Sequence, residues 1–152
     1  MPETSVEENV ASVRRWFDQV WNKKNSVAIH EMLAPDCVTH GTHDAGGDVR
    51  GPQGFSEFQA RILDAFPDMH IEVQDAFGFG DKVAVRWVAT MHHLGAGLGI
   101  EPTGAAIAIG GMGIARFANG KLAEAWDNWD KHSMFDRINA AAAAAQSKSA
   151  SA

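Results

Sequence analysis

The sequence has a single cysteine, no long apolar run and fewer basic than acidic side chains, and each shortage excludes a class of protein. Cys37 has no second cysteine within the chain, so no intrachain disulfide can form. Glycines, histidines and charged residues interrupt every apolar run before it reaches the length of a transmembrane helix. The 13 basic and 19 acidic side chains give a net charge of −6, which disfavours a nucleic-acid-binding surface.

The first five residues also lack the basic start and the apolar core of a secretory signal peptide. We expect Cys37 to be a buried, unreactive thiol, because no activating base lies at a fixed spacing from it. A lone cysteine without a signal peptide predicts a cytoplasmic protein.

The chain is long enough for one domain with one core, and its 45% hydrophobic and 21% charged residues are typical of a soluble globular protein. We expect this domain to span residues 1–139. The tail, residues 140–152, consists mainly of alanine and serine and has no apolar pattern to bury. We therefore expect the tail to fray or to be disordered.

The periodicity of apolar residues changes from helical to strand-like along the chain. Helical spacing predicts helices at 5–21, 26–33 and 52–66. Alternation then predicts strands at 69–77, 82–93, 105–117 and 121–130, followed by a short helix at about 131–139. This order indicates an α+β fold, in which a curved antiparallel sheet packs on three N-terminal helices and forms a cone. The interior of such a cone is a natural pocket for a small molecule.

The last predicted strand carries the candidate catalytic residue. Alternation places Asp127 on one face with two alanines and Trp129, and places Leu122 and Trp126 on the other face. Small neighbours leave room for a ligand, and an apolar pocket raises the pKa of a carboxyl group toward values useful in acid–base catalysis. The alternative is a solvated aspartate on an edge strand, which composition alone favours.

Several short motifs follow one another along the chain. They are Asp36-Cys37-Val38-Thr39-His40, Arg50-Gly51-Pro52-Gln53-Gly54-Phe55, Phe66-Pro67-Asp68, Gly80-Asp81-Lys82-Val83-Ala84-Val85-Arg86-Trp87, His92-His93-Leu94-Gly95, Pro102-Thr103-Gly104 and the stretch from Gly120 to Asp130. In this order they resemble the SnoaL-like polyketide cyclases and ester cyclases of the NTF2-like superfamily, over most of the chain. The resemblance implies a cone-shaped fold with a pocket and, in the authentic cyclases, an intramolecular aldol condensation without metal or cofactor.

In those cyclases an aspartate of the last strand serves as acid and base, and its position matches Asp127. The cyclases also carry a histidine in the preceding strand, where this chain has Gly113. This departure argues against activity on the same substrates. The superfamily also includes isomerases, epoxide hydrolases and binding modules, so the fold alone does not determine the function.

Two histidines are candidates to replace the missing one. His93 has the parity of Val85 and Trp87 and matches a histidine position of the family, so we expect it to border one cavity with Asp127. His40 precedes the glycine-rich segment 41–51, which we interpret as a loop, and matches a histidine common in the ester cyclases. A hydrogen-bonded structural role for His40 is an equal alternative.

The remaining site candidates are substrate contacts. Trp129 shares a face with Asp127, and Trp87 and Gly113 lie on the neighbouring predicted strands. Arg86 is either a ligand for a substrate carboxylate or carbonyl group, or one half of a structural ion pair, which we favour. No histidine or acid spacing matches a zinc signature, so we expect neither a metal nor a cofactor.

Three functions fit these residues. In the first, Asp127 removes a proton α to a carbonyl of a hydrophobic, polyketide-like compound while His93 or His40 polarises the oxygen, which gives an aldol-type cyclisation or an isomerisation. The second is a non-catalytic small-molecule binding module, which becomes the better interpretation if neither histidine nor Arg86 reaches the cavity. The third is an epoxide hydrolase, ranked last because the close Arg-x-Asp pairing is absent.

The predicted outer face of the sheet suggests how the chain assembles. Leu122 and Trp126 are expected to form an exposed apolar patch there, and such a patch usually meets a partner. We therefore expect a symmetric homodimer packed through the sheet, as the resemblance also implies. We expect no nucleic-acid or membrane partner.

Overall fold

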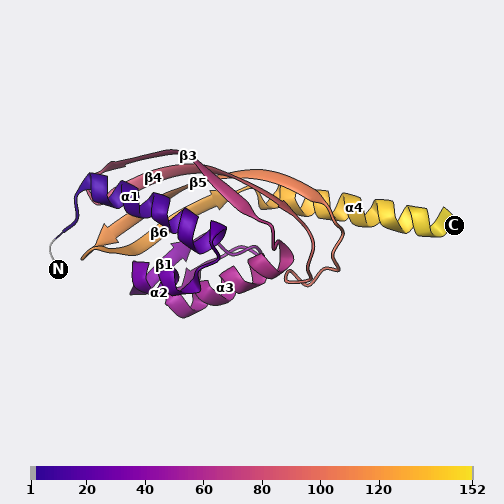
Figure 1. The fold of residues 1–152 in the computed structure, drawn as a ribbon, viewed down its shortest axis with the longest axis horizontal. Coiled ribbons are helices and arrows are strands. Elements are labelled where there is room, and N and C mark those ends of the chain that lie inside the picture. The colour runs from indigo at the N-terminus through magenta and orange to yellow at the C-terminus, as the bar shows by residue number, and fades with distance from the viewer. Residues whose placement is uncertain (1–2, 152) are drawn as a thin grey trace.

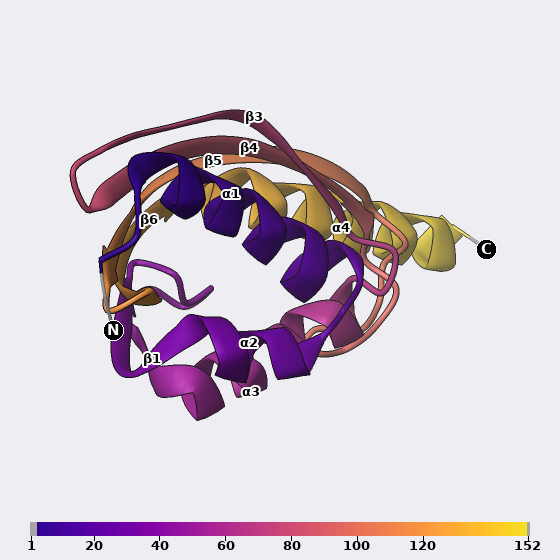
Figure 2. The same ribbon diagram turned by 60° about the vertical axis from the view of Figure 1, so that its left-hand side comes forward.

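The computed structural model describes residues 3–151 and confirms the α+β fold, a strongly curved sheet that wraps around helices (Figures 1 and 2). Residues 1, 2 and 152, at the ends of the predicted domain and tail, lie outside the described residues. No helix in the described part of the chain is both long and apolar enough to cross a membrane.

The predicted helices are present on the concave side of the sheet. α1 (Val6–Trp16) continues into a π-helical turn, η1 (Phe17–Asn22), and is followed by α2 (Ser26–Met32) and α3 (Gly51–Ala65). Ser5 caps α1, because its hydroxyl oxygen accepts a hydrogen bond of 3.1 Å from the backbone N–H of Glu8.

The sheet has the strand order β2-β1-β6-β5-β4-β3. Its strands are β1 (Leu33–His40), β2 (Val49–Arg50), β3 (His70–Phe79), β4 (Lys82–His92), β5 (Ala106–Ala118) and β6 (Lys121–Trp129). The sheet is antiparallel except where β1 joins β6 in parallel. This parallel pairing brings the glycine-rich loop after β1 next to the end of β6.

An extra residue in β6 changes the faces that simple alternation predicts. The register between β5 and β6 shifts between Arg116 and Phe117, so Ala123 forms a β-bulge. A bulge reverses the alternation of side chains on one side of it. Leu122 is therefore buried in the core, and the prediction that it lies on the outer face with Trp126 is wrong.

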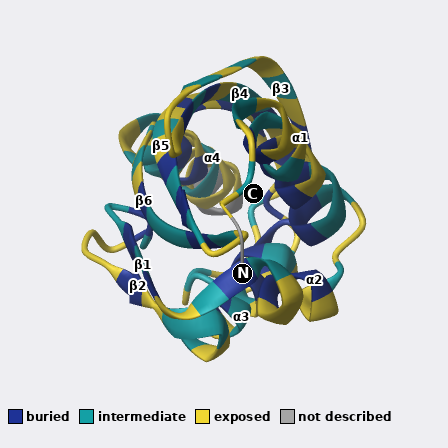
Figure 3. Ribbon diagram, turned by 90° about the vertical axis from the view of Figure 1, so that its left-hand side faces the viewer, coloured by how far each residue is buried: buried dark blue, intermediate teal, exposed yellow. Residues whose placement is uncertain are grey.

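The hydrophobic core lies between the helices and the concave face of the sheet, as the buried residues in Figure 3 show. The inward side chains of β4 and β5, such as Val85 and Ile109, alternate with exposed ones. The core thus forms the wall of the cone, and the cavity described below lies inside it.

The C-terminal helix, α4 (Lys131–Ser151), begins at the core and then leaves it. Met134 and Ile138 are fully buried and anchor its first turns. The helix continues through residues 140–151, most of the tail for which we expected fraying or disorder, and projects away from the body (Figure 1). Six consecutive alanines, the best helix formers, explain why this exposed segment is helical.

Candidate functional site

The cone contains a partly open cavity of about 110 Å³. Helices α1 and α3, strands β3 to β6 and the start of α4 all contribute to its wall, which is almost entirely aliphatic and aromatic. Apart from indole rings, the polar side chains among the described residues that line it are Thr39, Thr42 and Asp127. An apolar cavity of about 150 Å³ can hold benzene, so a ring compound would fill this smaller cavity and extend toward its open side.

Asp127 brings the one carboxyl group of this lining. It lies on β6 opposite Gly113 of β5. Its Oδ2 accepts a hydrogen bond of 2.6 Å from the hydroxyl group of Thr42. A Cβ atom at Gly113 would lie only 2.6 Å from its Oδ1. The carboxyl group therefore occupies the space that any side chain at position 113 would need.

The electrostatic environment of Asp127 favours the protonated form. Burial raises the pKa of its carboxyl group above the usual range, because the apolar wall solvates the charged form poorly. The Thr42 hydrogen bond and the positive charge of Lys131 lower the pKa, but by less. The carboxyl group consequently keeps its proton to a higher pH than an aspartate in water.

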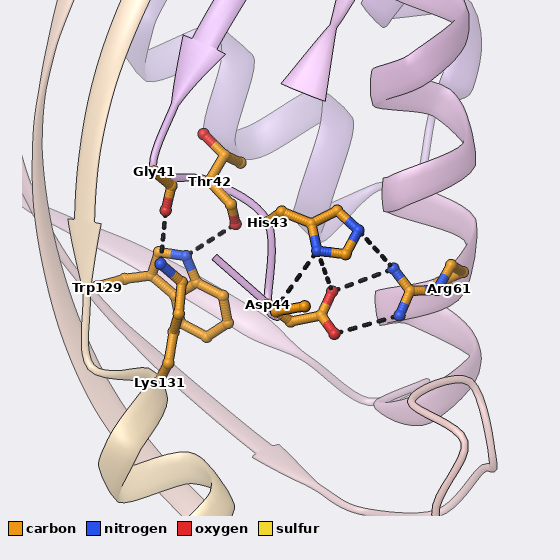
Figure 4. Close-up of polar contacts among 8 residues, drawn as sticks. Gly41, Thr42, His43, Asp44, Arg61, Trp129 and Lys131 are labelled. Carbon is orange, nitrogen blue, oxygen red and sulfur yellow. Dashed lines mark hydrogen bonds and ion pairs between the residues drawn. The ribbon is translucent and has the colours of Figure 1, made fainter. Parts of the chain in front are cut away.

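The loop after β1 brings Thr42 to the cavity and is held against β6 and α4 (Figure 4). Gly41 packs so closely that a Cβ atom there would lie 2.5 Å from the backbone oxygen of Asp127, and its φ is +74°. The indole N–H of Trp129 donates to the Thr42 carbonyl oxygen at 3.0 Å, and Lys131 Nζ donates to the Gly41 carbonyl oxygen at 2.6 Å. The Lys131 ammonium group also lies 5.3 Å from the centre of the Trp129 ring.

An ion pair with α3 fixes the other side of this loop. The Arg61 guanidinium donates two hydrogen bonds, of 3.1 and 3.2 Å, to the two carboxylate oxygens of the buried Asp44 (Figure 4). Sequence analysis missed Thr42, Asp44 and Arg61 as parts of the site. For Thr42 and Asp44 the available signal was the run of polar residues between the glycines of a loop, which is where functional residues often lie, whereas Arg61 lies on α3 and had no such signal.

Trp129, Trp87 and Gly113 line the same cavity as Asp127. Trp87 of β4 pairs with Gly111 of the neighbouring strand β5. A Cβ atom at Gly111 would lie 2.3 Å from the Trp87 ring. The glycines of β5 therefore make room for the indole ring of Trp87 and for the carboxyl group of Asp127.

The structure does not bring His93 to the cavity. β4 ends at His92, and the chain then turns onto the end of α3, where the backbone N–H of Leu94 donates to the Ala65 oxygen at 3.0 Å. His93 is fully buried, its Nδ1 accepts a 3.2 Å hydrogen bond from the backbone N–H of Thr103, and burial lowers its pKa. The expectation that it borders one cavity with Asp127 is not met.

His40 also lies outside the cavity. Its Nε2 is 2.7 Å from an oxygen of Glu124 and its Nδ1 is 3.3 Å from Asp48, and its ring stacks on Trp126 at 5.6 Å. The hydrogen bond with Glu124 raises the pKa of His40. These contacts correspond to the structural alternative.

Arg86 is exposed and forms an ion pair rather than a cavity contact. Its Nη2 and Nε lie 2.7 and 2.9 Å from one oxygen of Asp75 on the neighbouring strand β3.

Cys37 is buried as predicted, and burial raises the pKa of its thiol to about 12. Within residues 3–151, no cluster of three or more histidine, cysteine or acidic side chains could hold a metal ion.

Together, the curved sheet, the covering helices and the cavity between them define a cone-shaped α+β protein of the NTF2-like kind. The family model for SnoaL-like polyketide cyclases matches residues 11–138, so the chain belongs to this family.

Similar solved structures share the fold of this chain. A SnoaL-like protein from Jannaschia sp. CCS1 is 22% identical, with a TM-score of 0.78 over 91% of this chain and 96% of that chain. AclR from Streptomyces galilaeus, a proposed hydroxylase, is 27% identical, with a TM-score of 0.76 over 89% of this chain and 87% of that chain. IdmH from Streptomyces antibioticus, a proposed polyketide cyclase, is also 27% identical, with a TM-score of 0.73 over 86% of this chain and 98% of that chain. No curated protein matches the chain.

Proposed function

We propose that the cavity binds a hydrophobic small molecule that presents an oxygen atom to the carboxyl group of Asp127. The observation that carries this proposal is the lining, in which the described residues place one carboxyl group and two threonine hydroxyl groups in a wall that is otherwise aliphatic and aromatic. Such a pocket binds its ligand mainly by burying apolar surface, and its few polar groups set the orientation.

We favour binding over catalysis because the described lining of the cavity has no charged or imidazole donor to act together with Asp127. Enolisation needs a base and also a donor that stabilises the oxygen on which charge develops. Asp127 is a suitable base, but the described residues that line the cavity include no histidine, lysine or arginine. The hydroxyl group of Thr42 already donates to Asp127.

Proton transfer by Asp127 is the second candidate, supported by its raised pKa and by the family. In this mechanism, the ionised carboxyl group takes a proton from the carbon α to a carbonyl group and leaves an enolate. In an aldol-type cyclisation the enolate then attacks a second carbonyl group, and the protonated Asp127 returns its proton to the new alkoxide. In an isomerisation of an unsaturated carbonyl compound, the dienolate takes the proton back from Asp127 at the far end of the conjugated system. The substrate class would be hydrophobic, polyketide-like carbonyl compounds, and no cofactor takes part in these steps.

2-Tetralone, a bicyclic ketone with exchangeable α hydrogens, tests both candidates. We expect saturable binding in a calorimetric titration with the wild type and with Asp127→Asn. If Asp127 also catalyses proton transfer, exchange of the α hydrogens in D₂O, followed by NMR, should be about 100-fold slower with Asp127→Asn than with the wild type. Equal exchange rates would leave binding as the function, and the absence of saturable binding would refute the proposal. Arg86→Ala, outside the cavity, is the control variant.

A further inference from the structure

Two buried threonines line the cavity, and only one of them contacts the carboxyl group. Thr39 and Thr42 are 3% and 5% exposed. The hydroxyl group of Thr42 donates to Oδ2 of Asp127 at 2.6 Å. The hydroxyl group of Thr39 instead donates to the carbonyl oxygen of Val49 at 3.4 Å. The chain thus contains a natural internal control for the role of a cavity threonine.

The backbone around Thr42 is held from both sides of the cavity. The indole of Trp129 binds the carbonyl oxygen of Thr42 itself, and Lys131 binds that of the preceding glycine. Two residues further on, Asp44 is clamped by Arg61 of α3. Figure 4 shows these contacts converging on one short segment, which gives the Thr42 hydroxyl group a fixed position.

We propose that Thr42 is a positioning residue, whose hydroxyl group holds Oδ2 of Asp127 and leaves Oδ1 as the oxygen available to the ligand. Oδ1 lies next to Gly113, which itself lines the cavity and has no side chain that could shield it. This inference rests on the proposed function, because it assigns Thr42 a role in the same binding site.

The groups around Asp127 make the effect of Thr42 measurable. β5 contributes the uncharged Gly113, and α4 contributes Lys131, whose positive charge lowers the pKa of Asp127. The charged Asp44 is already paired with Arg61. A hydroxyl group that donates to a carboxylate stabilises the charged form, so its removal must raise the pKa further.

The experiment measures the pKa of Asp127 from the pH dependence of its carboxyl ¹³C NMR signal, which is assigned by its absence in Asp127→Asn. Thr42→Val keeps the shape of the side chain and removes the donor, so we expect a rise of about one pH unit or more. Thr42→Ser keeps the donor and should restore the wild-type value. Thr39→Val is the matched control and should leave the pKa of Asp127 unchanged. If Thr42→Val does not fold, Thr42→Ala removes the same hydroxyl group.

An unchanged pKa in Thr42→Val, or an equal shift in Thr39→Val, would overturn the inference. This titration needs no ligand, so its outcome does not depend on whether the cavity binds 2-tetralone. Failure of the proposed function would appear as no binding of 2-tetralone to the wild type, with the Thr42 shift still present. Failure of the inference alone would appear as normal 2-tetralone binding with no Thr42 shift.

Discussion

Gly113→Ala tests whether Asp127 depends on the missing side chain of its neighbour. The new Cβ atom would lie 2.6 Å from Oδ1 of Asp127 and 2.9 Å from the backbone oxygen of Trp126. The carboxyl group could rotate away only by disturbing its hydrogen bond with Thr42. The backbone oxygen could move only if the pairing of β5 and β6 shifted. Forcing an extra methyl group into a packed site of this kind costs about 1–3 kcal/mol.

Gly110→Ala is the matched control on the same strand. Its Cβ atom would lie 3.5 Å from the Trp87 carbonyl oxygen, which is an ordinary contact, and residue 110 is exposed. Neither Gly110 nor Gly113 has a positive φ, so alanine meets no backbone strain at either position. We expect Gly110→Ala to change the free energy of unfolding by no more than about 0.5 kcal/mol.

Urea denaturation of both variants, followed by tryptophan fluorescence, measures the difference. The expected result is a lower midpoint for Gly113→Ala and, in the NMR titration, a changed pKa of Asp127. Equal stabilities of the two variants with an unchanged pKa of Asp127 would refute the argument that Gly113 makes room for the carboxyl group.

Two further predictions concern pH and assembly. Because burial raises the pKa of Asp127, the folded state keeps a proton that the unfolded state loses above about pH 4, so wild-type stability falls as pH rises to the folded pKa. The free energy of unfolding of Asp127→Asn relative to wild type should therefore increase with pH across that window in urea titrations, and a constant difference would contradict this. We also propose a homodimer through the outer face of the sheet, where Met112, Ile114 and Trp126 are exposed. Sedimentation should show a dimer that Trp126→Glu dissociates, and a wild-type monomer at micromolar concentration would refute it.

The strands and helices were predictable because their apolar residues repeat with a clear period. Val83 to Met91 alternate along β4, and a side chain on the wrong face there would expose apolar surface. The bulge at Ala123 was not predictable, because it appears only in the pairing of β6 with β5 and no residue type in β6 marks its position. Asp127 and Trp129 kept their predicted relation because both lie on the same side of that bulge.

The contact between Thr42 and Asp127 was beyond sequence analysis. Thr42 and Asp127 are 85 positions apart, and their contact depends on the parallel pairing of β1 with β6. The spacing of apolar residues within one segment does not show which distant strand that segment pairs with. His93 shows the opposite error, because its parity on β4 was extended one residue past the end of the strand, where the chain already turns toward α3.

The glycine at position 113 has a consequence for the chemistry that this cavity can support. A histidine there, as in the cyclases that the chain resembles, and the present position of the Asp127 carboxyl group exclude each other, because even a Cβ atom would come within 2.6 Å of Oδ1. The site therefore replaces a carboxyl–imidazole pair with a carboxyl–hydroxyl pair, and the hydroxyl group is used up by the carboxyl group. With no cationic or imidazole donor among the described lining residues, the ligand itself would have to supply most of the stabilisation of an enolate. A carbon between two carbonyl groups, or between a carbonyl group and an aromatic ring, meets this requirement, since the negative charge of its enolate is delocalised over the second carbonyl group or the ring. Any catalysis by Asp127 should thus be restricted to such activated carbonyl compounds, whereas binding extends to unactivated ketones of the same shape.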